Sequence, residues 1–261
     1  IRTFSRGGSD ITGSIVACAV EADIYENWTD VSGMLMADPR CVPDPEPIAT
    51  ITYKELRELS YMGATVLHDE AIFPVREVGI PINIRNTNDP DARGTFIVPT
   101  VGKDDMPPHQ VTGVAGHKGF MTISVEKDMM NSELGFGRKV LAVLEKHGVS
   151  FEHLPSGIDT LSVIVDEKSM AGIEQRVIDD ICRAVEPDTI SVERDIALIA
   201  VVGRGLVSAK GTAGRVFTAI GDADVNIKMI DQGSSELNII VGVSGEDYVP
   251  ALRAIYNEFV K

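Results

Sequence analysis

A glycine-rich segment near the start of the chain has residue types suited to binding an anion. Residues 5–10 read Ser-Arg-Gly-Gly-Ser-Asp and lead into an apolar stretch. The glycines let the backbone approach a ligand closely, while Ser9 and Asp10 can cap a helix whose first N–H groups favour negative charge. Arg6 adds a planar guanidinium that matches carboxylate or phosphate. The segment predicts either an anion site or a capped surface helix with an Arg–Asp pair of little energetic worth.

A second polar cluster follows a short predicted strand at residues 23–28. Thr29 and Asp30 come directly after it, and Arg40 closes the sequence Ala-Asp-Pro-Arg. In open α/β sheets, ligands collect at the carboxyl ends of strands. There Thr29 and Asp30 offer acceptors for a purine or ribose, and Arg40 offers a cation for phosphates. The alternative is a capped turn that Asp38 initiates before a proline.

Helices and strands alternate through the first hundred residues, which predicts an α/β layer. Thr52 and Glu55 form a capping-box pattern at the start of one helix, and Gly63 is a plausible stop for it. Residues 38–47 contain four prolines and exclude regular helix or a central strand. Residues 99–109 have no periodicity and form the best linker candidate. The predicted helices are 11–22, 52–63 and 69–78, and the predicted strands are 23–28, 80–85 and 95–98.

An internal repeat occupies the rest of the chain. When the sequence is shifted by 76 residues, glycine and apolar positions coincide without a gap; Gly135 falls on Gly211 and Val140 on Val216. Each copy reads strand, glycine loop, helix, strand, strand, helix. The strands are 121–125, 149–154 and 160–165 in copy one and 196–202, 225–230 and 236–243 in copy two. The helices are 135–147 and 168–184 in copy one and 212–223 and 246–259 in copy two.

Copy one continues into a fourth strand at 189–192, which completes a βαββαβ unit, but copy two ends without one. Because an unpaired strand edge is a liability, we expect residues 110–115 to cross back and pair with copy two. The predicted domains are therefore residues 1–98, a linker at 99–109, copy one at 119–193 inserted within copy two, and copy two at 110–118 and 194–261.

Composition excludes several classes of protein. The 24 basic and 39 acidic side chains give a formal charge of −15, which disfavours binding to nucleic acid or to an anionic membrane. No apolar run is long enough to span a bilayer. The three cysteines form neither a disulfide framework nor a zinc pattern, which favours the cytoplasm. The first residues carry no signal core, and the chain opens directly on a glycine loop, as if cut from a longer protein.

Taken together, the motifs resemble those of the aspartate kinase family. Residues 5–10, 28–40 and 60–68, in this order, are similar to the carboxyl half of an amino-acid-kinase domain. The tandem βαββαβ units resemble a pair of ACT domains, and residues 225–239 are similar to the second ACT domain of aspartate kinases without a fused dehydrogenase. The resemblance implies an amino-acid-kinase (carbamate-kinase-like) α/β sandwich remnant, followed by α+β ferredoxin-like ACT domains.

The resemblance also implies a reaction: transfer of a phosphoryl group from ATP, with Mg²⁺, to the side-chain carboxylate of L-aspartate. This is the first step of lysine, threonine and methionine biosynthesis, and it needs no tightly bound cofactor. Arg6 matches a substrate-binding arginine and Ser9 a substrate contact, while Asp10 matches the carboxylate that organises the catalytic lysine, so that Arg6 and Asp10 are the catalytic candidates. The positions that match nucleotide contacts are Thr29, Asp30, Leu35, Arg40 and Thr65.

Three departures from the family pattern bear on activity. Thr65 stands where many relatives have a nucleotide-binding lysine, and Leu35 stands where a tyrosine is frequent. The amino-terminal half of the kinase domain, which carries a lysine-glycine-glycine segment in the family, is not in this sequence. We therefore expect the 261-residue chain itself to be inactive. The alternative function is a non-catalytic amino-acid-sensing subunit that binds a complete kinase chain.

ACT pairs commonly bind an amino acid beside a glycine loop, and family members are inhibited by lysine, threonine or both. Glu152 or Asp159 in copy one could pair with a lysine ammonium, which favours L-lysine over L-threonine as effector. Copy two has Lys228 at the position of Glu152, so we expect it to be structural and to form a homodimer contact with copy one of a partner. The effector-binding candidates are Met129, Asn131, Ser132, Gly135, Phe136, Phe151, Glu152, Ser156, Gly157 and Asp159. No metal site is predicted.

Overall fold

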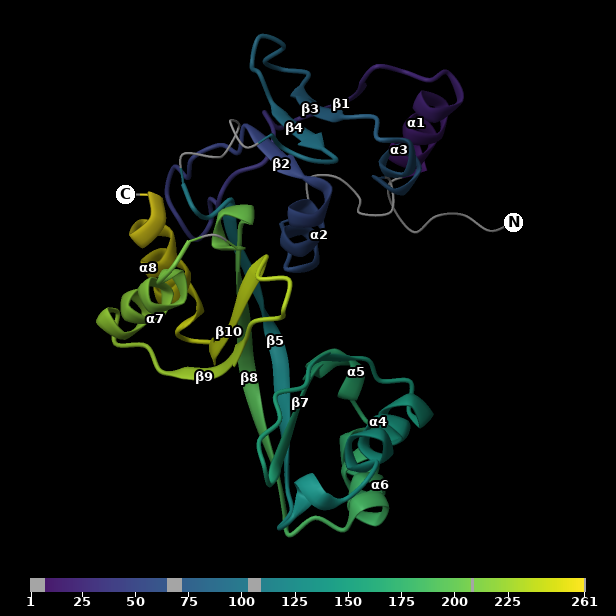
Figure 1. The fold of residues 1–261 in the computed structure, drawn as a ribbon, viewed down its shortest axis with the longest axis vertical. Coiled ribbons are helices and arrows are strands. Elements are labelled where there is room, and N and C mark those ends of the chain that lie inside the picture. Colours follow the sequence, from purple (N-terminus) through teal and green to yellow (C-terminus); the bar gives the residue numbers. More distant parts are fainter. Residues whose placement is uncertain (1–7, 65–71, 103–108, 208, 261) are drawn as a thin grey trace.

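Two β-sheets organise the chain in a computed structural model that describes residues 8–64, 72–102, 109–207 and 209–260. A four-stranded sheet belongs to the amino-terminal part, and a six-stranded sheet belongs to the tandem repeat (Figure 1). The amino-terminal part sits on one end of the larger sheet, where its helix α2 (Tyr53–Tyr61) approaches β5 and β8. Among the described helices, none has the length and apolar character needed to cross a membrane.

The amino-terminal part is the expected α/β layer, with some displaced boundaries. The helix predicted over 11–22 is α1 (Gly8–Ala19), which begins and ends three residues earlier than predicted. The helix predicted over 69–78 is described only from Phe73, since residues 65–71 lie outside the described residues. Its other elements are β1 (Tyr25–Thr29), β2 (Thr50–Thr52), α3 (Phe73–Val78), β3 (Ile82–Asn86) and β4 (Thr95–Val98).

The four-stranded sheet has the order β1-β3-β4-β2. Strand β1 is parallel to β3, β3 is antiparallel to β4, and β2 is parallel to β4. Strand β2 was not predicted from the sequence, because three residues leading into a helix give too short a pattern to detect. The carboxyl ends of the parallel strands β1 and β3 lie at the same edge, and that edge carries the polar cluster after β1.

Helix α2 starts as its sequence predicts. The Thr52 hydroxyl accepts a hydrogen bond from the Glu55 N–H, and the Glu55 carboxylate accepts one from the Thr52 N–H, so both halves of the capping box are present. Leu56 and Leu59 on the same helix are each 1% exposed. After the helix, Gly63 adopts a φ of +98°, a conformation that favours glycine and ends the helix.

The repeat folds as one sheet of order β6-β7-β5-β8-β10-β9. Its strands are β5 (Gly113–Glu126), β6 (Phe151–His153), β7 (Thr160–Asp166), β8 (Thr189–Val202), β9 (Ile227–Asp231) and β10 (Asn238–Ser244). Its helices are α4 (Phe136–Lys146), α5 (Glu167–Met170), α6 (Glu174–Val185), α7 (Thr212–Asp222) and α8 (Tyr248–Val260), with short 3₁₀ turns at Met130–Ser132 and Arg204–Val207. Helices α4 and α6 pack beside the copy-one end of the sheet, and α7 and α8 lie beside its copy-two end, on the opposite side in the view of Figure 1.

The long strands β5 and β8 join the two copies. Residues 113–115 lie opposite 200–202 of copy two, whereas Glu126 at the other end lies opposite Thr189 of copy one. The first half of β5 therefore supplies the strand that copy two lacks, as the edge argument predicts. The division into domains drawn from that argument stays a prediction.

The repeat period is visible in backbone geometry as well. Gly135 and Gly211, 76 residues apart, precede the first helix of each copy with φ values of +80° and +84°. One prediction was wrong in detail: the helix expected over 168–184 is two helices, because Gly172 with a φ of +74° interrupts it between α5 and α6.

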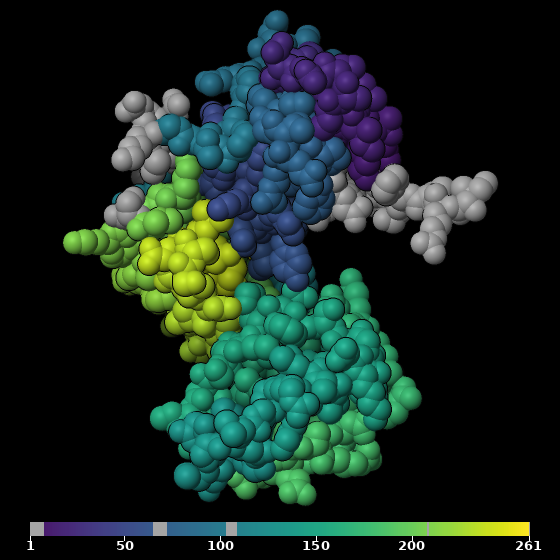
Figure 2. Space-filling view, turned by 45° about the vertical axis from the view of Figure 1, so that its right-hand side comes forward, coloured from purple at the N-terminus to yellow at the C-terminus, as the bar shows by residue number. Residues whose placement is uncertain are grey.

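Buried apolar side chains fall into two clusters. One cluster is confined to copy one and includes Ile123, Val140 and Val177. The other runs without a break from the amino-terminal part into copy two, and it includes Leu56, Val201 and Tyr256. The amino-terminal part and copy two thus share one core, and in Figure 2 copy one forms a separate lobe below them.

Candidate functional site

A cleft of about 700 Å³ lies where the amino-terminal part meets copy two. Three of the predicted nucleotide contacts, Asp30, Leu35 and Arg40, line it. Thr29 is not among its lining residues, and Thr65 lies outside the described residues. The remaining wall comes from the connection between β1 and β2, from the end of α2, and from the start of β5; its residues include Met62, Gly63, Ala64, Asn86, Val114, Ala115 and Gly116.

Thr29 and Asp30 occupy the carboxyl end of β1, as predicted for ligand contacts. The Thr29 hydroxyl donates to the Asp30 carboxylate over 3.3 Å, and the Thr29 carbonyl accepts hydrogen bonds from the N–H and hydroxyl of Thr87. Beside them the Asn86 amide donates to Ser32 Oγ over 2.8 Å. The Asp30 carboxylate is exposed at this edge, where it can accept hydrogen bonds from a ligand.

Arg40 forms a two-pronged ion pair with Asp38. Its Nη2 lies 2.6 Å from Asp38 Oδ2 and its Nε lies 3.0 Å from both carboxylate oxygens. These hydrogen bonds hold the pKa of the Asp38 carboxyl below its usual range. The Asp38 carbonyl also accepts the N–H groups of Cys41 and Val42, so the turn expected from the Asp-Pro pair is present too. The Arg40 side chain is 86% exposed, so it is open to an incoming anion as well as paired.

Asp10 is held by β1 through residues that the sequence did not single out. The Asn27 amide donates to Asp10 Oδ1 over 3.2 Å and to the Tyr25 hydroxyl over 3.1 Å, and the Tyr25 hydroxyl donates to the Asp10 carbonyl. Tyr25, Asn27 and Thr29 alternate along β1 and share a face, which brings Asp10 to the same side of the strand as Thr29.

The glycine loop itself is only partly described. Helix α1 begins at Gly8, and Ser9 Oγ lies 3.5 Å from Asp10 Oδ1. Arg6 lies outside the described residues. Burial raises the pKa of the Tyr25 hydroxyl against an opposing hydrogen bond from Asn27, which keeps the phenol neutral beside Asp10.

In copy one, the loop before α4 and the turn before β7 lie together. The Lys127 N–H donates to the Asp159 carbonyl over 2.9 Å, which joins the loop that contains Met129, Asn131, Ser132 and Gly135 to the turn that contains Ser156 and Gly157. Ser132 Oγ donates to the Met129 carbonyl, and Met129 is 68% exposed. Phe136, another predicted contact, is 4% exposed and packs in the core of copy one.

Two lysines hold the middle of that loop. Lys127 Nζ lies 2.8 Å and Lys139 Nζ 2.5 Å from the Glu133 carboxylate. Hydrogen bonds from both ammonium groups lower the pKa of Glu133 and so favour its ionised form. These three residues were not among the predicted site residues.

Glu152 makes a different contact from the one expected. The Tyr61 hydroxyl, at the end of α2, donates to the Glu152 carboxylate. The next residue, His153, places Nδ1 2.6 Å from Asp231 of β9. Phe151 precedes them on the edge strand and is 45% exposed. Strand β6 therefore contacts both the amino-terminal part and copy two.

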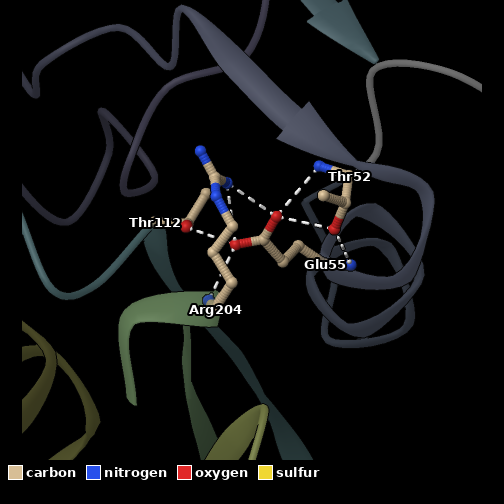
Figure 3. A network of polar contacts seen from close by, with 4 residues as sticks. All are labelled: Thr52, Glu55, Thr112 and Arg204. Carbon is tan, nitrogen blue, oxygen red and sulfur yellow. Dashed lines mark hydrogen bonds and ion pairs between the residues drawn. The ribbon is translucent and has the colours of Figure 1, made fainter. Parts of the chain in front are cut away.

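A buried polar network joins the amino-terminal part to copy two (Figure 3). Glu55 is fully buried, and its carboxylate accepts hydrogen bonds from Thr52, from the Thr112 hydroxyl over 2.6 Å and from the Arg204 N–H over 2.9 Å. Arg204 Nη1 lies 2.9 Å from Glu55 Oε2 as an ion pair. The sequence shows only the local half of this network, because Thr112 and Arg204 are distant along the chain.

In the described part of the chain, no three His, Cys, Asp or Glu side chains gather in a way that could hold a metal ion.

Two families match parts of the chain. Residues 2–86 match the amino acid kinase family, and residues 199–259 match the ACT domain family. Aspartokinase 3 of Bacillus subtilis (strain 168) is 46% identical over 258 residues, which is 98% of this chain and 56% of that protein. The chain therefore spans about half the length of this relative.

Solved structures agree with these matches. The aspartate kinase of Clostridium acetobutylicum superposes with a TM-score of 0.93 and 54% identity, over 99% of this chain and 59% of that one. Aspartokinase III of E. coli, in complex with aspartate and ADP, superposes with a TM-score of 0.80 and 27% identity, over 98% of this chain and 56% of that one. The same E. coli enzyme is also known in complex with lysine and aspartate.

Proposed function

The chain belongs to the aspartokinase family, and we propose that it contributes nucleotide and substrate contacts to the transfer of a phosphoryl group from ATP to the side-chain carboxylate of L-aspartate. One observation carries this proposal: the cleft lined by Asp30, Leu35 and Arg40 lies beside the carboxyl end of β1, in a chain 46% identical to an aspartokinase over 98% of its length.

The side chains at the cleft suit a nucleoside polyphosphate. Asp30 presents a carboxylate at the cleft, and Thr29, the residue before it at the end of β1, presents a hydroxyl as a further partner for ribose or purine groups. Arg40 can turn from Asp38 toward phosphate oxygens, because its guanidinium is exposed and the exchange replaces one anion with another. Phosphoryl transfer depends chiefly on positioning and charge neutralisation, which such groups supply together with Mg²⁺ bound to the phosphates.

In this proposal Ser9 contacts the aspartate substrate, and Asp10 is the carboxylate that organises the catalytic lysine. The Asn27 amide fixes Asp10 on the face of β1 that also carries Thr29, so a catalytic carboxylate and a nucleotide contact converge on one strand. We assign Arg6 to the substrate carboxylate on the family resemblance. Leu35 at the cleft removes the tyrosine contact expected in relatives and leaves an apolar wall there.

A titration of the 261-residue chain with MgADP, followed by calorimetry and by the fluorescence of its single tryptophan, Trp28, tests the nucleotide assignment. We expect saturable binding that Asp30→Asn and Arg40→Gln weaken and that Lys228→Gln, far along the repeat, leaves unchanged. Equal affinity in all four proteins would refute the assignment. The same chain should release no ADP from ATP and L-aspartate; measurable release would overturn the expectation that it is inactive.

Copy one is the proposed effector module, with L-lysine as the first ligand to test. The loop and turn joined by Lys127 and Asp159 provide exposed backbone groups for the α-amino and α-carboxylate groups of an amino acid. The carboxylate of Asp159 is the remaining candidate for the lysine side chain, because Glu152 is bonded to Tyr61. Calorimetry with L-lysine and L-threonine tests the site. Absence of heat for both would leave the module structural.

A homodimer through the ACT domains is the proposed assembly, and the exposed Phe151 on the edge strand β6 is consistent with a pairing surface there. Sedimentation of the chain and of Phe151→Lys distinguishes a dimer from a monomer. A monomer at micromolar concentration in both would refute this assembly.

A further inference from the structure

Helix α8, the last helix of copy two, touches the connection between β1 and β2 at its backbone. The Glu46 N–H donates to the Tyr256 hydroxyl over 2.9 Å, and Arg253 Nε donates to the Cys41 carbonyl. Tyr256 is 1% exposed, so a buried side chain holds this backbone group of the connection. Contacts to backbone atoms fix the path of the connection, whatever its side chains are.

This connection needs partners from outside itself. Residues 38–47 contain four prolines, which have no N–H to donate, and form no regular strand or helix. The backbone hydrogen bonds of this segment include the turn at Asp38 and a bond that the Glu46 carbonyl accepts from the N–H of Met36, outside the segment. Because backbone groups left without partners are costly when buried, the two side chains of α8 stabilise this segment by bonding its Glu46 N–H and its Cys41 carbonyl.

Residues 38–47, which α8 holds in this way, include Arg40, the positively charged side chain that lines the cleft. Cys41, whose carbonyl Arg253 holds, directly follows Arg40, and its N–H closes the turn on the Asp38 carbonyl. The direction of the Arg40 side chain therefore depends on a turn that α8 anchors from behind. Tyr248, on the first turn of the same helix, donates to the carbonyl of Gly116, another residue that lines the cleft.

We propose that Arg253 and Tyr256 are positioning residues of the nucleotide cleft, which hold residues 38–47 so that Arg40 faces a bound phosphate. The proposal rests on the nucleotide assignment made above. It gives copy two a role that sensing an amino acid does not require. The shared core of copy two and the amino-terminal part supports it, because α8 belongs to the same packed unit as the cleft wall.

The direct test is backbone hydrogen exchange in the full chain. Tyr256→Phe removes only the hydroxyl, and Arg253→Gln removes the guanidinium from an exposed position. We expect the Glu46 N–H to exchange about 5- to 10-fold faster in Tyr256→Phe, as expected for one lost hydrogen bond. Glu258→Gln, on the same helix, breaks the pair with Arg215 instead and should leave the Glu46 exchange unchanged.

Amides of β10 serve as the folding control, because this strand lies in the same core as Tyr256 and is hydrogen-bonded to β8 and β9. Unchanged exchange across residues 38–47 in both Tyr256→Phe and Arg253→Gln would overturn the proposal. Faster exchange throughout β10 would mark loss of the fold in that variant, and the exposed Arg253→Gln then decides the matter.

A titration with MgADP tests the consequence for the ligand. We expect affinity to fall about 3- to 10-fold in Arg253→Gln and Tyr256→Phe, to recover partly in Arg253→Lys, and to stay constant in Glu258→Gln. Faster exchange with unchanged affinity would overturn the positioning role. If the unchanged chain binds no MgADP, the nucleotide assignment fails by itself, and the exchange data alone decide whether α8 holds the segment.

Discussion

Replacing Glu55 with glutamine should destabilise the unit formed by the amino-terminal part and copy two, without affecting copy one. The Glu55 carboxylate is fully buried, and each of its oxygens accepts three hydrogen bonds. Oε1 accepts from the Thr112 hydroxyl and from the N–H and Nη1 of Arg204, and Oε2 accepts from the N–H and hydroxyl of Thr52 and from Nη1 of Arg204. A glutamine keeps one oxygen and turns an NH₂ toward donors at the other, so three contacts are lost. At about 1 kcal/mol for each, the free energy of unfolding should fall by about 3 kcal/mol.

Glu55→Gln also removes the negative charge that pairs with Arg204, which lowers the free energy of unfolding further. Removing one partner of a buried ion pair costs about 3–5 kcal/mol, which exceeds the value for an exposed pair several-fold. Lys228→Gln is the matched control, since its pair with Glu193 is half exposed and should contribute less than about 1 kcal/mol.

The assay is urea unfolding followed by the fluorescence of Trp28, which lies in the amino-terminal part, and by circular dichroism for the whole chain. We expect the fluorescence midpoint to fall in Glu55→Gln and the signal from copy one to keep its own midpoint. A change below about 0.5 kcal/mol at pH 7, the usual size for a surface substitution, would refute the reasoning.

Acid should reduce the difference in unfolding free energy between the wild-type chain and Glu55→Gln. Burial alone raises the pKa of Glu55, but hydrogen bonds from Thr112, from Thr52 and from backbone N–H groups outweigh it, and the pKa lies below its ordinary 4.5. The contribution of Glu55 to stability is therefore complete above pH 4.5 and is lost as the pH falls through the lower folded-state value. The gap between wild type and Glu55→Gln should narrow over that range. A gap that stays constant from pH 7 to pH 3 would contradict the lowered pKa.

Three further predictions test local features. Gly135→Ala should cost about 1 kcal/mol because φ is +80° there, whereas Gly137→Ala, inside α4 with open space around it, should stabilise by about 0.5–1 kcal/mol; opposite signs in thermal unfolding are the check. Hydrogen bonds from Lys146 and His147 lower the pKa of Asp180 to about 2, so an NMR titration should show a midpoint there that Lys146→Gln raises. Gly94→Ala should yield no folded amino-terminal part, because its Cβ would lie 1.9 Å from the Ile84 carbonyl; an unchanged circular dichroism spectrum would contradict this.

Sequence reasoning reached the features that local pattern encodes. The capping box of α2 is visible because Thr52 and Glu55 are three residues apart, and the repeat is visible because Gly135 and Gly211 need the same backbone conformation. The edge-strand argument also found that residues 113–115 pair with copy two, since an open edge requires a partner.

The features that sequence reasoning missed depend on residues far apart in the chain. Arg204 is 149 residues from Glu55, and Tyr61 is 91 residues from Glu152, so no spacing rule relates them. Glu152 was interpreted as a free acidic partner for an effector because its strand pattern says nothing about α2. Tertiary packing therefore decides which surface carboxylates are already hydrogen-bonded within the protein and which can bind a ligand.

The division into two cores constrains how an effector bound to copy one could reach the cleft. Copy two and the amino-terminal part share a core, whereas most buried side chains of copy one form a cluster of their own. Strand β6 links copy one to both other parts through the contacts of Tyr61 with Glu152 and of His153 with Asp231. Tyr61 ends α2, and that end supplies Met62 to the cleft wall. The hydrogen bond between Tyr61 and Glu152 therefore connects copy one to the residue that directly precedes Met62 of the cleft wall.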